Sequence, residues 1–241
     1  MLLHTNPLFF IYFGTAKDNL FQAQYLNLPQ EPILTISPFE KLKKVMNAQQ
    51  LFFAHQVHSD RGIVVDQDVL QNSAPFKSDA DFLVTNQPHV GIGVMTADCL
   101  PIVFHDKVRN VVAVTHAGWR GAVIGVAVKT VEMMSEIYGS DPSGIAVFFG
   151  PSAKVCCYKV GEDFMKNLAG FAYADRVLQQ HEGGWFFDLP LFNRIQLEAA
   201  GIKKEAFHLD YNICTMCDES FYSHRRQGES AGRQMTVACL T

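Results

Sequence analysis

Residues 82–121 read FLVTNQPHVGIGVMTADCLPIVFHDKVRNVVAVTHAGWRG, and this stretch decides the predicted fold. It contains four short apolar runs rich in Val, Ile and Phe, separated by polar residues or by Gly and Pro, which is the pattern of neighbouring β-strands. The runs are 82–85, 91–95, 101–105 and 111–115. Residues 106–110 form a mostly polar break with the length and chemistry of a hairpin connection. We therefore predict that the third and fourth strands are antiparallel.

The segments around this block add helices and further strands. After Gly118, apolar residues recur at steps of three and four as far as Ile137, and Gly139 follows, which predicts an amphipathic helix of about four turns. A second helical stripe runs from 191 to 200, with Asp188 as its N-cap and Gly201 as its stop. The remaining predicted elements are strands at 8–13, 145–149 and 185–187 and a short helix at 161–168.

The order of these elements favours an α+β fold. Several strands follow one another directly, so we expect mixed sheets with helices packed outside them, not regular β-α-β alternation. No repeat, low-complexity tract or linker interrupts the chain. Residues 1–241 are therefore expected to form a single domain.

Composition excludes several classes of protein. Of the 241 residues, 48% are hydrophobic and 18% are charged, which predicts a compact folded chain. The net charge of −4 and the scattered basic residues argue against a nucleic-acid partner. The apolar run at 8–13 lacks the basic flank of a signal peptide, and no run reaches the roughly 18 apolar residues of a membrane span. We expect a cytoplasmic protein with no membrane partner, and the sequence predicts no particular oligomeric state.

Three segments carry polar residues that a packed core does not require: 56–59 (QVHS), 96–101 (TADCLP) and 115–121 (THAGWRG). Cys99 precedes one strand of the predicted hairpin, and His116 follows the other. In an antiparallel pair the start of one strand lies beside the end of the next, so both side chains reach the same edge of the sheet. Such a pair suits either a Cys nucleophile with a His base or two ligands of a metal such as zinc. A third donor decides between them.

These segments resemble a known family, the YfiH-like family, also called the laccase-domain, polyphenol oxidase or purine nucleoside phosphorylase family. The resemblance runs from residue 50 to the end of the chain. Its motifs are Gln56-Val57-His58, Ala97-Asp98-Cys99-Leu100-Pro101, His116-Ala117-Gly118-Trp119-Arg120-Gly121, Gly150-Pro151 with Cys157-Tyr158, Cys214-Thr215, Phe221-Tyr222-Ser223 with Arg225-Arg226, and Gly232-Arg233.

The resemblance implies a fold, a metal and a reaction. The family fold is two mixed sheets packed together with helices outside, similar to the deamidase domain of cytotoxic necrotizing factors. The family's zinc ligands correspond to His58, Cys99 and His116, with copper as an alternative metal. The implied activity is phosphate-dependent cleavage of adenosine, inosine, guanosine or methylthioadenosine, with adenosine deamination as a further activity. Purine nucleosides and phosphate are thus the expected small-molecule partners.

Five further residues are candidates for catalysis or substrate binding. Beside Cys99 and His116, the candidate catalytic residues are Asp98, which would orient a ligating histidine, and Arg120. Arg120 and one of Arg225 or Arg226 would bind phosphate or the ribose, because guanidinium groups suit such bidentate contacts. Trp119 would stack on the purine base. The structural alternatives are a turn cap for Asp98, ion pairs for the arginines and core packing for Trp119.

Several features point away from this assignment. At 13–18 the chain reads FGTAKD, where family members usually carry an Arg and a Gly-Gly-Val-Ser loop. A metal-free hydrolase or deamidase with Cys99 as nucleophile and His116 as base remains an alternative, as does a metal-binding protein without turnover. Laccase chemistry is poorly supported, because multicopper sites use many His-x-His pairs and none of the nine histidines forms one.

The remaining histidine and cysteine candidates are predicted to be structural. His55 should face away from His58 on a strand and is predicted to be a bystander. The Cys214-x-x-Cys217 spacing is typical of two zinc ligands, but no second pair of ligands follows at the usual distance in the sequence. Both cysteines are therefore predicted to pack in the interior. One or both of the adjacent Cys156 and Cys157 are predicted to lie in the core.

Overall fold

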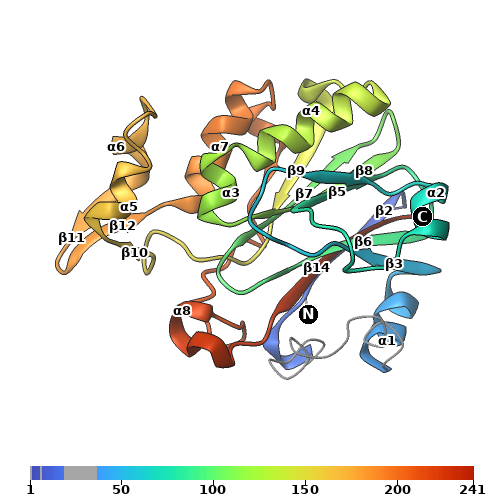
Figure 1. Ribbon diagram of the computed structural model, residues 1–241, viewed down its shortest axis with the longest axis horizontal. Helices are drawn as coiled ribbons and strands as arrows, with labels where there is room; N and C mark the ends of the chain where they lie inside the picture. Colours follow the sequence, from blue (N-terminus) through green and yellow to red (C-terminus); the bar gives the residue numbers. More distant parts are fainter. Residues whose placement is uncertain (1, 6, 19–36) are drawn as a thin grey trace.

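The computed structural model describes residues 2–5, 7–18 and 37–241 (Figure 1). The strands are β1 (Leu2–Thr5), β2 (Phe9–Phe13), β3 (Gln50–Phe53), β4 (Gly62–Val64), β5 (Phe82–Thr85), β6 (Val90–Thr96), β7 (Leu100–Asp106), β8 (Val111–Ala117), β9 (Ile145–Phe149), β10 (Lys159–Val160), β11 (Leu178–His181), β12 (Gly184–Phe187), β13 (Phe207–His208) and β14 (Gln234–Leu240). The α-helices are α1 (Ser37–Val45), α2 (Gln67–Asn72), α3 (Trp119–Val123), α4 (Val126–Tyr138), α5 (Glu162–Lys166), α6 (Ala174–Val177), α7 (Leu189–Ala199) and α8 (His224–Gln227).

Two large mixed sheets form the centre of the molecule. One has the strand order β1-β2-β14-β6-β3 and the other β13-β9-β7-β8-β5-β4, while β10, β12 and β11 form a small separate sheet. Both large sheets combine antiparallel and parallel pairs, the parallel ones being β3 with β6, β4 with β5 and β9 with β13. The predicted α+β architecture with mixed sheets is confirmed.

The two sheets pack against each other and helices cover their outer faces (Figure 1). Val103 of β7 belongs to the core between the sheets, whereas its neighbours Ile102 and Phe104 belong to the core beneath α4 and α7. On the other side, Phe39 and Leu42 of α1 pack against the five-stranded sheet. Because β7 and β8 are covered on both faces, all their residues are buried, which explains why most of them are apolar.

The predicted hairpin is present and fixes the position of the candidate site. β7 and β8 are antiparallel, with Leu100 opposite Ala117 and Pro101 opposite His116. At the far end of the hairpin, Oδ1 of Asp106 accepts hydrogen bonds from the backbone N–H groups of Val108 and Arg109. The register places the residue before β7 beside the last residues of β8.

The predicted helix after Gly118 differs from the observed one in a single respect. It is divided into α3 and α4 at Gly125, whose φ of 83° lies in the left-handed region that favours glycine. Gly139, with φ 67°, ends α4 as predicted. Asp188 caps α7 as predicted, because its Oδ1 accepts from the N–H of Leu191 at 2.9 Å. No helix among the described residues is long and apolar enough to cross a membrane.

Candidate active site

Three potential metal ligands converge at the end of the β7–β8 hairpin. His58 lies in the loop between β3 and β4, Cys99 in the tight turn between β6 and β7, and His116 near the end of β8. Their donor atoms lie within 4.8 Å of one another, and Cys99 Sγ is 3.8 Å from Nε2 of His58. Usual zinc bond lengths in a tetrahedral site place sulfur and nitrogen about 3.6 Å apart. The geometry therefore fits one zinc-sized ion.

Gly118 makes this convergence possible. A Cβ atom at this position would lie 2.7 Å from Cδ2 of His58 and 3.0 Å from Sγ of Cys99. The backbone of Gly118 has φ −67°, so the requirement is for space and not for a left-handed conformation. The glycine in the motif allows the chain to pass directly beside the two ligands.

Asp81 holds both histidines, although it is not among the residues predicted from the sequence. Oδ1 of Asp81 lies 2.8 Å from Nδ1 of His116 and accepts from the backbone N–H of His58 at 2.9 Å. Oδ2 accepts from the N–H and the hydroxyl of Ser59. With Nδ1 engaged, Nε2 of His116 is the ring nitrogen left for a metal. These bonds also stabilise His58 in its left-handed conformation, with φ 61°.

Cys99, His116 and Asp81 each shift the pKa of a neighbour toward its charged form. Burial disfavours the Cys99 thiolate, but the charge of His116 and hydrogen bonds from both histidines outweigh it and lower the pKa of Cys99 to about 6. Burial likewise disfavours a charged His116, yet Cys99 and Asp81 raise the pKa of His116 to about 9. Hydrogen bonds from His116 and Ser59 lower the pKa of Asp81 to about 2 despite its burial. The buried pair thus favours the thiolate that metal binding requires, and a metal that binds at Nε2 of His116 has to displace a proton from that ring.

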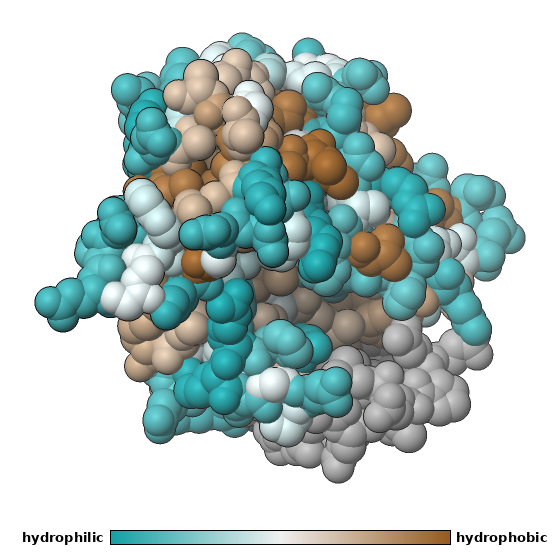
Figure 2. Space-filling view, turned by 60° about the vertical axis from the view of Figure 1, so that its left-hand side comes forward, coloured by the Kyte–Doolittle hydropathy of each residue, from teal (hydrophilic) through white to brown (hydrophobic). Residues whose placement is uncertain are grey.

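The three donors open onto a pocket of about 560 Å³, within the usual size range for small-molecule sites. Figure 2 shows a hollow near the centre of this side of the molecule, with a largely hydrophilic rim. The pocket lining includes three arginines, Arg120, Arg225 and Arg233, and three aromatic residues, Phe76, Trp119 and Tyr158. A metal-binding triad, cationic groups and aromatic rings therefore share one cavity.

Two of these arginines lie over aromatic rings of the same pocket. The Arg120 guanidinium is 4.5 Å from the ring centroid of Trp119, and that of Arg225 is 5.2 Å from the ring of Tyr158. Arg225 also donates from Nη1 to the carbonyl of Lys159, and Arg233 donates from Nη1 to the carbonyls of Ala231 and Gly232. Arg233 belongs to the Gly232-Arg233 motif, one of those on which the family resemblance rests, but no role was predicted for it.

Comparison with known proteins identifies the family. The profile described as multi-copper polyphenol oxidoreductase laccase matches residues 37–241. The chain belongs to this laccase family. It is 30% identical over 235 residues to a purine nucleoside phosphorylase of Clostridium acetobutylicum, covering 95% of this chain and 90% of that protein. It is 36% identical over 200 residues to an adenosine deaminase from an unknown prokaryotic organism, covering 79% of this chain and 75% of that protein.

The fold of this laccase-family chain also has a solved counterpart. The crystal structure of the hypothetical protein YfiH from Bacillus licheniformis superimposes with a TM-score of 0.83. The two chains are 26% identical, and the match covers 97% of this chain and 93% of the other. The resemblance to the YfiH-like family that the motifs indicated is confirmed.

Two predicted site residues of the laccase-family chain do not fit their roles. The Asp98 carboxylate accepts from the hydroxyls of Thr215 and Ser223 and from the N–H of Arg225, so it does not orient a histidine. Asp81 has that position instead. Arg226 donates to the backbone carbonyls of Thr215, Met216 and Phe221 and does not line the pocket. Of the two adjacent arginines, only Arg225 faces the candidate site.

Two other predicted features lie at the edge of the pocket or outside it. His55 lines the pocket, but its Nδ1 lies 2.8 Å from the carboxylate of Asp79, and it is not among the three donors. The divergent segment at 13–18 packs against the C-terminal part of the chain, with Gly14 N–H donating to Met235 and Ala16 N–H to Ser220. None of residues 13–18, all of which are described, lines the pocket.

The prediction of a core position for Cys156 or Cys157 is wrong. Cys156 is exposed and Cys157 is half-buried. Both lie beside Cys214 and Cys217, the pair for which packing was predicted because no partner pair was visible in the sequence. The second pair exists, but its two cysteines are adjacent and lie about 60 positions earlier in the chain.

Proposed function

We propose that this protein is a zinc-dependent purine nucleoside phosphorylase and that the same pocket deaminates adenosine. The observation that carries the proposal is the presence of the His58, Cys99 and His116 donors in one cavity with three arginines and three aromatic rings. Relatives named purine nucleoside phosphorylase and adenosine deaminase support both reactions. Six free thiols support a cytoplasmic location.

Zinc suits the donor set. Two imidazoles and one thiolate are three protein ligands, the number found in catalytic zinc sites that keep one position open. A bound zinc ion supplies Lewis-acid chemistry at this end of the pocket. The same His and Cys donors also suit copper, so a metal analysis has to measure both ions.

Phosphorolysis needs positive charge where phosphate binds. A phosphate oxygen forms a bond to C1′ of the ribose while the bond from C1′ to the purine nitrogen breaks, and the departing base keeps the electron pair and takes up a proton. Arg120, Arg225 and Arg233 supply cationic N–H donors around the cavity. We assign phosphate binding to Arg120 and Arg225, the two predicted candidates that face the pocket.

The aromatic residues suit the purine base. Trp119 packs edge-on against Phe164, which holds its ring in one orientation at the pocket wall. Tyr158 and Phe76 present further rings to the cavity. Stacking on such rings would orient the base and exclude water from it, and it tolerates adenine, hypoxanthine and guanine alike because each has an aromatic face.

A nucleoside assay tests the proposal. Purified protein is incubated with adenosine, inosine, guanosine or methylthioadenosine, with and without phosphate, and free bases are measured by chromatography. Release of base should require phosphate and should be absent in Cys99→Ala. Conversion of adenosine to inosine without phosphate would report deamination. Failure to convert any of the four nucleosides would overturn the proposal and leave a metal-binding protein without turnover.

A metal-free nucleophile is the second candidate, because Sγ of Cys99 lies within 4.8 Å of a ring nitrogen of His116, which could act as its base. His58 separates the two functions. If the protein carries a metal in this pocket and His58→Ala removes both the metal and the activity, the nucleophile model fails. If a metal-free preparation retains full activity, the zinc-dependent function fails.

A further inference from the structure

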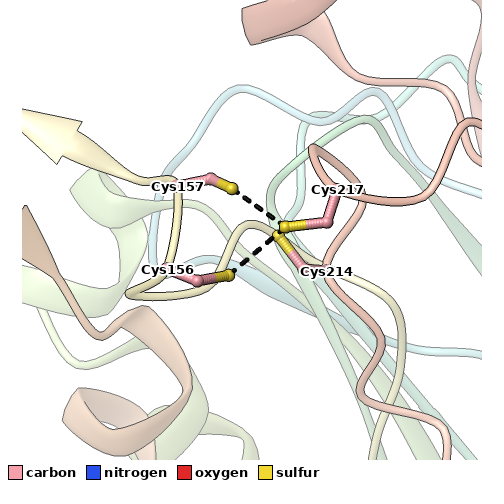
Figure 3. Close-up of side chains that lie close together, drawn as sticks. All are labelled: Cys156, Cys157, Cys214 and Cys217. Carbon is pink, nitrogen blue, oxygen red and sulfur yellow. Dashed lines mark hydrogen bonds between the residues drawn. The ribbon is translucent and has the colours of Figure 1, made fainter.

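Four of the six cysteines of the chain meet at a second place, outside the pocket. Cys156 and Cys157 belong to the turn that follows β9, and Cys214 and Cys217 belong to the loop before α8. All four sulfur atoms lie within 4.8 Å of one another, and all are free thiols. Figure 3 shows the four side chains pointing toward a common centre. We call these residues the four-cysteine cluster.

The sulfur atoms of the cluster lie close enough together to share one metal ion. Sγ of Cys217 lies 3.5 Å from Sγ of Cys156 and 2.9 Å from Sγ of Cys157. In a tetrahedral zinc site with Zn–S bonds of about 2.3 Å, the sulfur atoms are about 3.8 Å apart. Both distances are shorter than this value, so a bound ion would require Sγ of Cys157 and Sγ of Cys217 to move apart by about 0.9 Å. Disulfide bonds, by contrast, need sulfur atoms about 2 Å apart.

Two local features of the chain bring the four sulfur atoms together. Cys214 and Cys217 have the Cys-x-x-Cys spacing of zinc sites. Cys156 and Cys157 are adjacent, but they lie in a tight turn in which the N–H groups of Cys157 and Tyr158 both donate to the carbonyl of Lys154. Neighbouring side chains would alternate on a strand, whereas in this turn both face the second pair (Figure 3).

The two segments are also tied to each other. Ser152 donates to the carbonyl of Ile213 and accepts from the N–H of Thr215, and Nζ of Lys154 donates to the carbonyl of Asn212. The Arg226 guanidinium holds the carbonyls of Thr215 and Met216 from the other side. The Lys154 and Arg226 side chains thus fix the backbone of the loop that carries Cys214 and Cys217.

We propose that the four-cysteine cluster binds a second zinc ion, which has a structural role. Four protein ligands complete a tetrahedral shell, so this site has no open position for a substrate, unlike the triad in the pocket. The proposal does not depend on the nucleoside chemistry.

The four-cysteine cluster is directly connected to residues that form the wall of the pocket. Tyr158, which lines the pocket, directly follows Cys157. Thr215 directly follows Cys214, and its hydroxyl donates to Asp98, the neighbour of Cys99. The carboxylate of Asp98 also accepts from the N–H of Arg225. A metal that joins the two loops therefore stabilises the wall that carries Tyr158 and Arg225.

Metal content tests the proposal. The purified wild-type protein, measured by mass spectrometry of its metals, should contain two zinc ions per chain. The double variant Cys214→Ser/Cys217→Ser should contain one, and its midpoint of thermal unfolding should fall. His58→Ala should also contain one, since it removes one of the three ligands in the pocket and leaves the four-cysteine cluster unchanged. Cys239→Ala changes a buried cysteine that belongs to neither group and should keep both ions.

X-ray absorption at the zinc edge makes the test independent of how well the serine variant folds. In His58→Ala the remaining zinc should have four sulfur neighbours at about 2.3 Å and no nitrogen neighbour. Zinc that is lost in His58→Ala but unaffected by Cys214→Ser/Cys217→Ser would overturn the second site and leave the proposed function intact. Iron in place of zinc, or a disulfide between any two of the four cysteines in freshly purified protein, would also overturn it.

Discussion

Oδ1 of Asp81 lies 2.8 Å from Nδ1 of His116, and both side chains are almost completely buried. The same carboxylate binds the backbone of the loop that carries His58. One acidic residue therefore sets the ring orientation of one potential ligand and the loop position of another. Groups that hold metal ligands in this way contribute to metal affinity without touching the metal.

Asp81→Asn should lower the zinc affinity of the pocket site by about 10- to 100-fold. The amide can donate to Nδ1 of His116, which would move the imidazole proton to Nε2, the nitrogen needed for the metal. Competition with a chromophoric chelator measures the affinity. Asp79→Asn is the matched control, because Asp79 is half-exposed and pairs with His55 and Arg61 outside the triad. Equal affinities in the two variants would contradict the role given to Asp81.

Gly118→Ala should abolish metal binding in the pocket while the fold is kept. The added methyl group would lie 2.7 Å from Cδ2 of His58 and 3.0 Å from Sγ of Cys99, so at least one ligand has to move. Zinc content and circular dichroism measure the two effects. Gly161→Ala is the control, because it also changes a glycine that precedes a helix and meets no atom within 4 Å. Normal zinc content in Gly118→Ala would show that the ligands do not need this close approach.

Arg120→Ala and Arg226→Ala should have different effects. Arg120 faces the pocket, so its loss should raise the KM for phosphate about tenfold, the effect of losing one charge-assisted hydrogen bond, with little change in the unfolding temperature. Arg226 binds three backbone carbonyls, so its loss should lower the free energy of unfolding by about 2 kcal/mol. Steady-state kinetics and denaturant unfolding measure the two quantities. A large phosphate effect in Arg226→Ala alone would reverse the assignment.

The strands of the block at 82–115 could be predicted because they are short, apolar and clearly bounded, whereas β3 and β14 of the five-stranded sheet were not predicted. The run at 82–85 corresponds to β5 and that at 145–149 to β9, and the polar break at 106–110 predicted the antiparallel pairing of β7 and β8. The division between α3 and α4 was missed because apolar residues continue across Gly125 at helical spacing. Only the left-handed conformation of that glycine ends the first helix.

The candidate site was predicted less completely than the fold. Cys99 and His116 were placed together because they flank one hairpin, which is a local relationship. Asp81 lies 35 positions from His116, and no local pattern reveals a hydrogen bond over that separation. Its one visible signal in the sequence is a carboxylate directly before the mostly apolar run of β5, since a buried charge needs partners. The four-cysteine cluster was missed for the same reason, because its halves come from distant loops.

His105 on β7 is a titratable group in an apolar setting. Its ring lies 3.9 Å from that of Phe9, it is 5% exposed, and Nε2 has no hydrogen-bond partner among the described residues. Burial lowers the pKa of His105 to about 4; Asp106 opposes this shift, whereas His4 and Lys107 add to it. The imidazole is therefore neutral in the folded protein well below the pH at which it takes up a proton in the unfolded chain.

Stability should consequently fall as the pH is lowered from 6.5 to about 4, because only the unfolded chain binds the His105 proton in that range. The contribution is fully present above pH 6.5, and its complete loss amounts to on the order of 3 kcal/mol. His105→Leu has a similar volume and cannot titrate, so its free energy of unfolding should depend less steeply on pH. Urea unfolding of both proteins at several pH values between 4 and 7.5 measures the difference. Parallel curves would mean that another group controls the acid sensitivity of the fold.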